Sequence, residues 1–259
     1  LSKMSDDAIP LAISILKPLV KNNDISAAIL LGLIGDHTIL SILIEYASTF
    51  DNDDGCDAEI AEIMELAFWR MGKKAVPELI HGLEIAIKGD SIARGKTEIT
   101  RRSITGALGS IADERAIEPL IRTLKLEVDG EDYVTAKNCV YSLSVFADVR
   151  AANAIVNALQ HGDADVERVA RNMLRYGLVE GPFKKNSIRN DAVASLINLL
   201  QSENDSVVIN ATEILGDICE ENAIKPLQNL ISDEKFVKDI VTKALDQIHS
   251  GELNIEGEI

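Results

Sequence analysis

Residues 107–121 read ALGSIADERAIEPLI, and this stretch decides the fold. The apolar side chains in and just around it recur at spacings of three and four: Ile104, Leu108 and Ile111, then Ile117, Leu120, Ile121 and Leu124. This is the period of an α-helix with one buried face. Asp113 lies between the two groups and suits the N-cap of a second helix. The stretch therefore predicts two helices joined by a tight turn.

The same pattern returns along the chain. Residues 142–152 match it 35 positions later without a gap, residues 214–227 read ILGDICEENAIKPL, and earlier copies begin at Leu30 and Ala67. One apolar position marks each copy: Leu31, Phe68, Leu108, Leu143, Leu174, Leu215 and Leu245. We call these residues the marker positions. Their spacing of about 30 to 41 residues indicates a solenoid of helical pairs, each burying its apolar face against its neighbours.

We therefore predict an all-α fold, a right-handed α-α superhelix of about seven helical pairs and about fourteen helices. Residues 1–249 are expected to form a single solenoid, and residues 250–259 an acidic C-terminal tail. Pro119 and Pro226 fall inside second helices. Since an interior proline costs about 3 kcal/mol, those helices are expected to bend or to begin late. Three segments interrupt the array as longer linkers or insertions: residues 48–58, 89–97 and 178–187.

The pattern A-L-G-x-I-x-D-x-R-A-I-x-P-L-I resembles the short HEAT-like repeat, the type also called phycobilisome-lyase HEAT-like, and the resemblance extends over residues 7–248. It implies an armadillo-like α-solenoid whose concave face is lined by the first helix of each pair. It implies no single activity, because this repeat serves many roles.

Composition narrows the class of protein. Hydrophobic residues make up 46% of the 259, yet only 4% are aromatic, which suits helices packed through aliphatic side chains. The net charge is −16, and the surplus of acid lies at both ends of the chain. Such a charge argues against nucleic acid as a partner. No apolar run approaches the ~18 residues of a membrane span. Three scattered cysteines predict reduced thiols and a cytoplasmic location.

No catalytic motif is found in the sequence. Gly-rich phosphate loops and H-E-x-x-H are absent, and none of the four histidines is followed by Glu. The deoxyhypusine hydroxylases have similar repeats but hold di-iron with His-Glu pairs, so we exclude that activity. The acidic run at residues 51–57 lacks the ligand order of an EF-hand and is interpreted as a solvated loop. We predict no cofactor and no metal.

Under the resemblance, the non-core stripe of each first helix lines the groove. Around Leu108 this stripe is Arg102, Ser103, Gly106 and Ser110. Carried along the array, it gathers cations, amides and tyrosines: Arg70, Arg102, Lys137, Asn138, Tyr141, Arg168, Asn172 and Tyr176. Such a set suits an anionic or peptidic ligand. The simpler interpretation is that these are solvated or helix-pairing charges.

A second candidate surface is apolar. Four side chains line the N-terminal part of the groove: Ile29, Leu33, Ile63 and Leu66. A partner helix or a second copy of the chain could fill it, because exposed apolar patches mark interfaces. The simpler interpretation is that the first unit covers them as a cap.

These observations favour a non-enzymatic scaffold that binds an acidic peptide or protein segment in its groove, with self-association as an additional expectation. The alternatives are a nucleic-acid-handling protein resembling HEAT-like DNA glycosylases, or a bilin-lyase-like protein. The net charge of −16 argues against the first. No residue singles out bilin chemistry.

Overall fold

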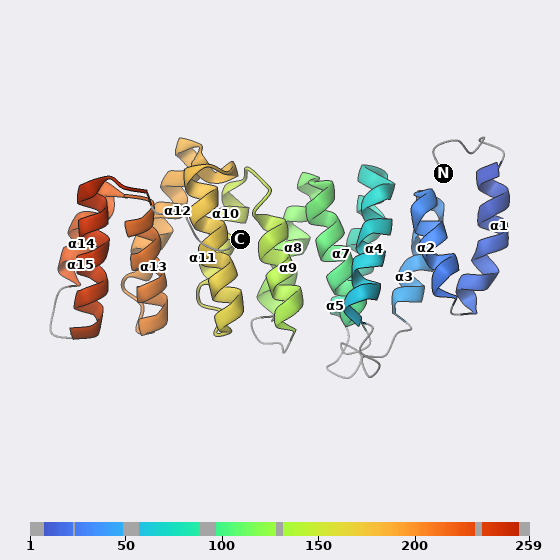
Figure 1. Ribbon diagram of the computed structural model, residues 1–259, viewed down its shortest axis with the longest axis horizontal. Coiled ribbons are helices and arrows are strands. Elements are labelled where there is room, and N and C mark those ends of the chain that lie inside the picture. The colour runs from blue at the N-terminus through green and yellow to red at the C-terminus, as the bar shows by residue number, and fades with distance from the viewer. Residues whose placement is uncertain are drawn as a thin grey trace. The chain divides into compact units, whose positions relative to one another are not determined.

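The computed structural model describes residues 8–22, 24–48, 57–88, 97–127, 132–230 and 235–253 (Figure 1). These residues hold fourteen α-helices and no strand, which confirms the all-α solenoid. The chain divides into two compact units, residues 1–142 and residues 143–259. The single solenoid of residues 1–249, its handedness and the acidic tail stay predictions. The predicted linkers at residues 48–58 and 89–97 lie largely outside the described residues.

Unit 1 is a stack of helical pairs. It begins with α1 (Ala8–Lys21), and its first helices are α2 (Ile25–Ile34), α4 (Asp57–Met71), α7 (Glu98–Ile111) and α9 (Tyr133–Leu143), the last ending at the unit's edge. Its second helices are α3 (Leu40–Ala47), α5 (Val76–Ile87) and α8 (Ile117–Glu127). Helix α1 packs on α2, α2 on α4 and α4 on α7, so the first helices form one continuous layer (Figure 1).

Unit 2 repeats the same construction. It begins with α10 (Val149–Ala158), followed by the first helices α11 (Ala164–Val179), α13 (Asp205–Asp217) and α15 (Lys235–Ser250) and the second helices α12 (Asn186–Leu199) and α14 (Ile224–Asn229). Helix α11 packs on α13 and α13 on α15.

The marker positions form the core of both units, as the repeat predicts. All seven are buried, six of them with no exposed surface. The core is therefore divided into layers of aliphatic side chains, one layer for each repeat.

The turn between the two helices is built as the sequence predicts. The side chains of Asp36, Asp113 and Asp148 each accept a hydrogen bond from the backbone N–H two residues later. After Asp113 a 3₁₀ turn at Glu114–Ala116 precedes α8, so Pro119 stands at the third position of that helix. Pro226 has the same position in α14. The second helices thus begin late, and neither proline removes an intrahelical hydrogen bond.

The segment at residues 178–187 is less of an interruption than predicted. Helix α11 continues to Val179, a 3₁₀ turn at Pro182–Lys184 follows, and α12 begins at Asn186. Phe183 is fully buried and lies directly over Gly177, where an added Cβ would come within 2.4 Å of the ring. An aromatic side chain thus anchors the segment to α11.

Candidate interaction surface

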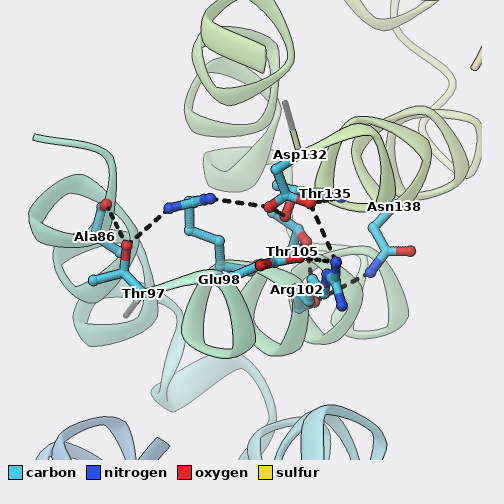
Figure 2. A network of polar contacts seen from close by, with 9 residues as sticks. Ala86, Thr97, Glu98, Arg102, Thr105, Asp132, Thr135 and Asn138 are labelled. Carbon is cyan, nitrogen blue, oxygen red and sulfur yellow. Dashed lines mark hydrogen bonds and ion pairs between the residues drawn. The ribbon is translucent and has the colours of Figure 1, made fainter. Parts of the chain in front are cut away.

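A buried polar network joins α7 to the start of α9 (Figure 2). The guanidinium of Arg101 donates to the carboxylate of Asp132 at 3.0 Å and to the hydroxyl of Thr97 at 2.8 Å. The Thr97 hydroxyl donates in turn to the carbonyl of Ala86 at 3.0 Å. Asp132 also accepts the backbone N–H of Thr135 at 3.0 Å and so caps α9. The side chains of Arg101 and Asp132 are only 3% and 7% exposed, so the network belongs to the core.

Arg102, one of the predicted groove cations, belongs to the same network. Its guanidinium pairs with Glu98 one turn earlier and lies 3.6 Å from a carboxylate oxygen of Asp132 (Figure 2). The amide of Asn138 donates to the carbonyl of Arg102 at 3.4 Å. The positive charge of Arg102 is therefore balanced within unit 1, and Asn138 holds two helices together.

The other predicted cations and tyrosines have mixed surroundings. The ammonium of Lys137 lies 5.2 Å from the centre of the Tyr133 ring, a cation–π geometry. In unit 2, Arg168 pairs with Asp165 at 3.3 Å. Arg70, Tyr141 and Tyr176 are exposed, and Asn172 is half-buried. Arg102 and Lys137 belong to unit 1 and Arg168 to unit 2, so their alignment in one row stays a prediction.

Internal carboxylates balance much of the predicted basic charge. The sequence could have revealed part of this, because Glu98 and Asp165 precede their arginines by one helical turn. Asp132 comes from the next repeat, and only the fold brings it to Arg101 and Arg102. Two further arginines of unit 2 are matched across helices, Arg171 with Glu213 at 2.5 Å and Arg175 with Asp217 at 2.9 Å.

The predicted apolar residues lie at the surface of unit 1. Ile29, Leu33 and Ile63 are half-buried, and Leu66 is 46% exposed. None is fully buried, so the first repeat does not cover them completely. Trp69, which sequence reasoning missed, is 47% exposed on the same helix as Leu66. It follows the marker Phe68, where the flanking repeats carry Gly32 and Gly109, and that break in the pattern was visible in the sequence.

A hollow of about 530 Å³ opens between α4 and α7, and we call it the α4–α7 hollow. Its lining residues come from both helices: Glu62, Glu65, Leu66, Trp69 and Ser110. The four residues from α4 are spaced i, i+3, i+4 and i+7, so they share one face of that helix. Leu66 and Ser110 belong to the predicted groove residues, whereas Glu65 and Trp69 do not.

Glu65 is the half-buried member of this set. Its carboxylate lies against the backbone of α7 at Gly106, where an added Cβ would come within 2.3 Å of an oxygen. The hydroxyl of Ser110 makes a long contact of 3.5 Å with the same carboxylate. Burial raises the pKa of Glu65 above its usual 4.5, the Ser110 contact lowers it, and the charge of Glu62 raises it further. Among the described residues no cation pairs with Glu65.

Comparisons with known proteins agree with the repeat. The family model of the PBS lyase HEAT-like repeat matches residues 100–125, which form α7, the capped turn and most of α8. Residues 100–125 thus match one HEAT-like repeat. The matched unit contains the stretch from which the other copies were recognised, and the described helices repeat its construction in both units.

Several solved structures are similar to this chain at low identity. An engineered protein has 21% identity and a TM-score of 0.39, with 87% of this chain and 98% of that one covered. Human deoxyhypusine hydroxylase in complex with glycerol has 17% identity and a TM-score of 0.35, with 93% and 99% covered. A designed armadillo repeat protein has 15% identity and a TM-score of 0.38, with 82% and 99% covered. No curated protein matches the chain.

Within the described residues, no three His, Cys, Asp or Glu side chains are grouped so that they could hold a metal ion. None of the described helices combines the length and the apolar character needed to cross a membrane.

Proposed function

We propose that the chain is a protein-interaction scaffold that binds a segment of a partner protein on the first-helix layer of unit 1. The observation that carries this proposal is the exposure of Leu66 and Trp69, nearly half of each side chain, beside the α4–α7 hollow. Large exposed apolar and aromatic side chains next to a concavity are typical of the centre of an interface. HEAT-like repeats commonly serve such a role, since each stack offers one extended surface.

The contact surface extends over α2 and α4. It comprises the hollow and the apolar side chains beside it: Ile29, Leu33, Ile63, Leu66 and Trp69. An acidic partner, as the sequence predicts, is less well supported, because Arg102 and Arg168 already have carboxylates of their own. The same pairing weighs against a phosphate backbone, which needs unpaired cations.

Selection from a random peptide library on the immobilised full chain tests the proposal. Peptides recovered by the native chain should be lost with Leu66→Asp, which places a charge in the contact surface, while far-UV circular dichroism stays helical. A matched control is Ile85→Asp, which alters an exposed apolar residue on α5. Recovery of no peptide, or equal recovery by both variants, would refute the proposal.

Self-association is a second use of an apolar surface that one observation favours. On α1 the side chains of Leu11, Ile15 and Leu19 are spaced by four residues on one face and are all exposed. A second copy of the chain would cover them. The mass in solution should then rise with concentration, and Ile15→Asp should keep the chain monomeric; a mass that is constant for the native chain excludes this use.

A further inference from the structure

The α4–α7 hollow contains the carboxylate of Glu65, and no cation among the described residues forms an ion pair with it. From this geometry we infer that the hollow binds the guanidinium of an arginine in a basic segment of the partner, with Glu65 as its ion-pair acceptor and Trp69 as its stacking surface. The inference rests on the proposed function and specifies the chemistry of the partner, which would be basic rather than acidic.

Glu65 occupies a position in the repeat that is fully buried in the other first helices of unit 1. It stands three residues before the marker Phe68. The equivalent residues in the other first helices of unit 1 are Ala28, Thr105 and Val140, all fully buried. A carboxylate at this register faces the neighbouring helix and is partly removed from water. Such a charge is costly unless an opposite charge or a hydrogen-bond donor meets it.

Gly106 leaves room on α7 for the carboxylate of Glu65. The residues at its register in the other first helices of unit 1 are Ile29, Leu66 and Tyr141, each with a large side chain. A glycine inside a helix costs about 1 kcal/mol relative to alanine. Here its missing Cβ lets the Glu65 carboxylate lie directly on α7. The pair is thus a local departure from the repeat pattern, and such departures are expected at functional sites.

Unit 2 shows how a charge at this register is satisfied. There Arg171 stands three residues before the marker Leu174, and Glu213 of α13 occupies the register of Gly106. The two form an ion pair at 2.5 Å. In unit 1 the carboxylate is present, and none of the guanidinium groups in the described ranges pairs with it. Arg70, five residues further along α4, forms no ion pair with Glu65 within the part of the chain that the structure describes.

The remaining lining of the hollow suits an arginine. A guanidinium is planar and weakly hydrated, stacks on an indole ring and binds a carboxylate through two hydrogen bonds. Trp69 supplies the exposed ring, Leu66 an apolar wall for the methylenes, and Glu62 a second acidic group at the rim. The net charge of −16 draws a basic segment toward the chain.

Fluorescence offers a direct test, since Trp69 is the single tryptophan of the chain. The full chain is titrated at low salt with a capped peptide of one arginine flanked by leucines and serines, and with the same peptide carrying neutral citrulline. The arginine peptide is expected to bind about tenfold more tightly. Equal binding of both peptides would overturn the inference.

Variants separate the role of Glu65 from that of the fold. Glu65→Gln should abolish the preference for arginine over citrulline, and Gly106→Ala should reduce it by displacing the carboxylate while favouring the helix. Glu78→Gln, which removes an exposed carboxylate from α5, should leave the preference intact. A preference that survives Glu65→Gln would overturn the inference.

The outcomes distinguish this inference from the proposed function. If library peptides lose binding with Leu66→Asp but none prefers arginine, the scaffold proposal stands and the arginine inference fails. A glutamate-containing peptide that binds more tightly than the arginine peptide also overturns the inference and supports an acidic partner. If no peptide binds at all, both fail together.

Discussion

The two units use the same helical register in opposite ways. In unit 2, Arg171 of α11 forms an ion pair with Glu213 of α13. In unit 1, Glu65 of α4 meets Gly106 of α7, and a hollow with an exposed tryptophan remains. A charge that is paired within the chain contributes to the stack, whereas Glu65, which pairs with no cation in the part of the chain that the structure describes, is available to a partner. Similar backbones thus carry a structural pair in one unit and a candidate site in the other.

The largest loss in the free energy of unfolding is expected when the most deeply buried charge is removed. Asp132→Asn removes the charge that faces buried Arg101, and loss of one partner of a buried pair costs about 3–5 kcal/mol. The matched variant in unit 2 is Asp217→Asn, which should cost less, because burial holds the pKa of Asp217 above its usual range despite Arg175 and Gln247. Denaturant unfolding measures both changes; equal losses would contradict this difference between the units.

The second prediction converts one unit into the other. Glu65→Arg combined with Gly106→Glu places the residue types of Arg171 and Glu213 at their registers in unit 1. Removing a helix-interior glycine and adding a surface ion pair should raise the free energy of unfolding by about 1–2 kcal/mol. The same variant should lose the arginine peptide. A destabilised double variant would show that the two registers differ in geometry.

A smaller effect is expected at the turn after each first helix. Ala112 and Cys219 both have a φ of 52°, the left-handed region, whereas Gly35 occupies the equivalent position in the first repeat with a φ of 71°. Ala112→Gly should therefore stabilise unit 1 by about 1 kcal/mol. Cys219→Gly should gain less, because the thiol contacts the carbonyl of Gln247 at 3.6 Å. Thermal unfolding compares the two; a loss of stability with Ala112→Gly would contradict the strain.

The smallest effect is a change in pH dependence. The pKa of Glu65 is raised above 4.5 in the folded chain, so the folded state holds its proton longer than the unfolded state. The contribution of this group to the free energy of unfolding therefore falls as pH rises from 4.5 through the raised pKa of the folded chain, and this range is the window in which the effect appears. Glu65→Gln should be more stable than the native chain above the window and equal to it below pH 4.5. Glu78→Gln serves as the charge control; an identical pH profile for Glu65→Gln and the native chain would contradict the raised pKa.

The sequence predicted the repeat well because the marker positions and the capping aspartates act locally. Leu108 and Asp113 are set by helical period and turn chemistry, which a single copy displays. The late start of the helices at Pro119 and Pro226 followed from the same local rules. What a side chain meets on the next helix is a different matter. Arg102 looked like a groove cation because Asp132, thirty residues later, is brought to it only by the fold.

The candidate site was predicted only in part, for the same reason. Leu66 and Ser110 lay on the predicted stripe, but Glu65 was not among the predicted site residues. Only the packing of α4 on α7 shows that Gly106 leaves its carboxylate accessible. The sequence did contain a signal in the comparison of repeats, because Glu65 and Trp69 stand where the first repeat has the small residues Ala28 and Gly32.

The Glu65–Gly106 pair is defined by its positions in the repeat, so the same two residue types can be placed at these positions in another repeat. The double substitution Ala28→Glu and Leu66→Gly would place the same two residue types on α2 and α4. The acidic position would then lie one repeat earlier. A series of such positions would contact successive residues of a basic segment, and each repeat would either bind a guanidinium or exclude it. The transfer would also place a carboxylate at Ala28, which is buried in the core, so the glycine that makes room for it is as necessary as the acid itself.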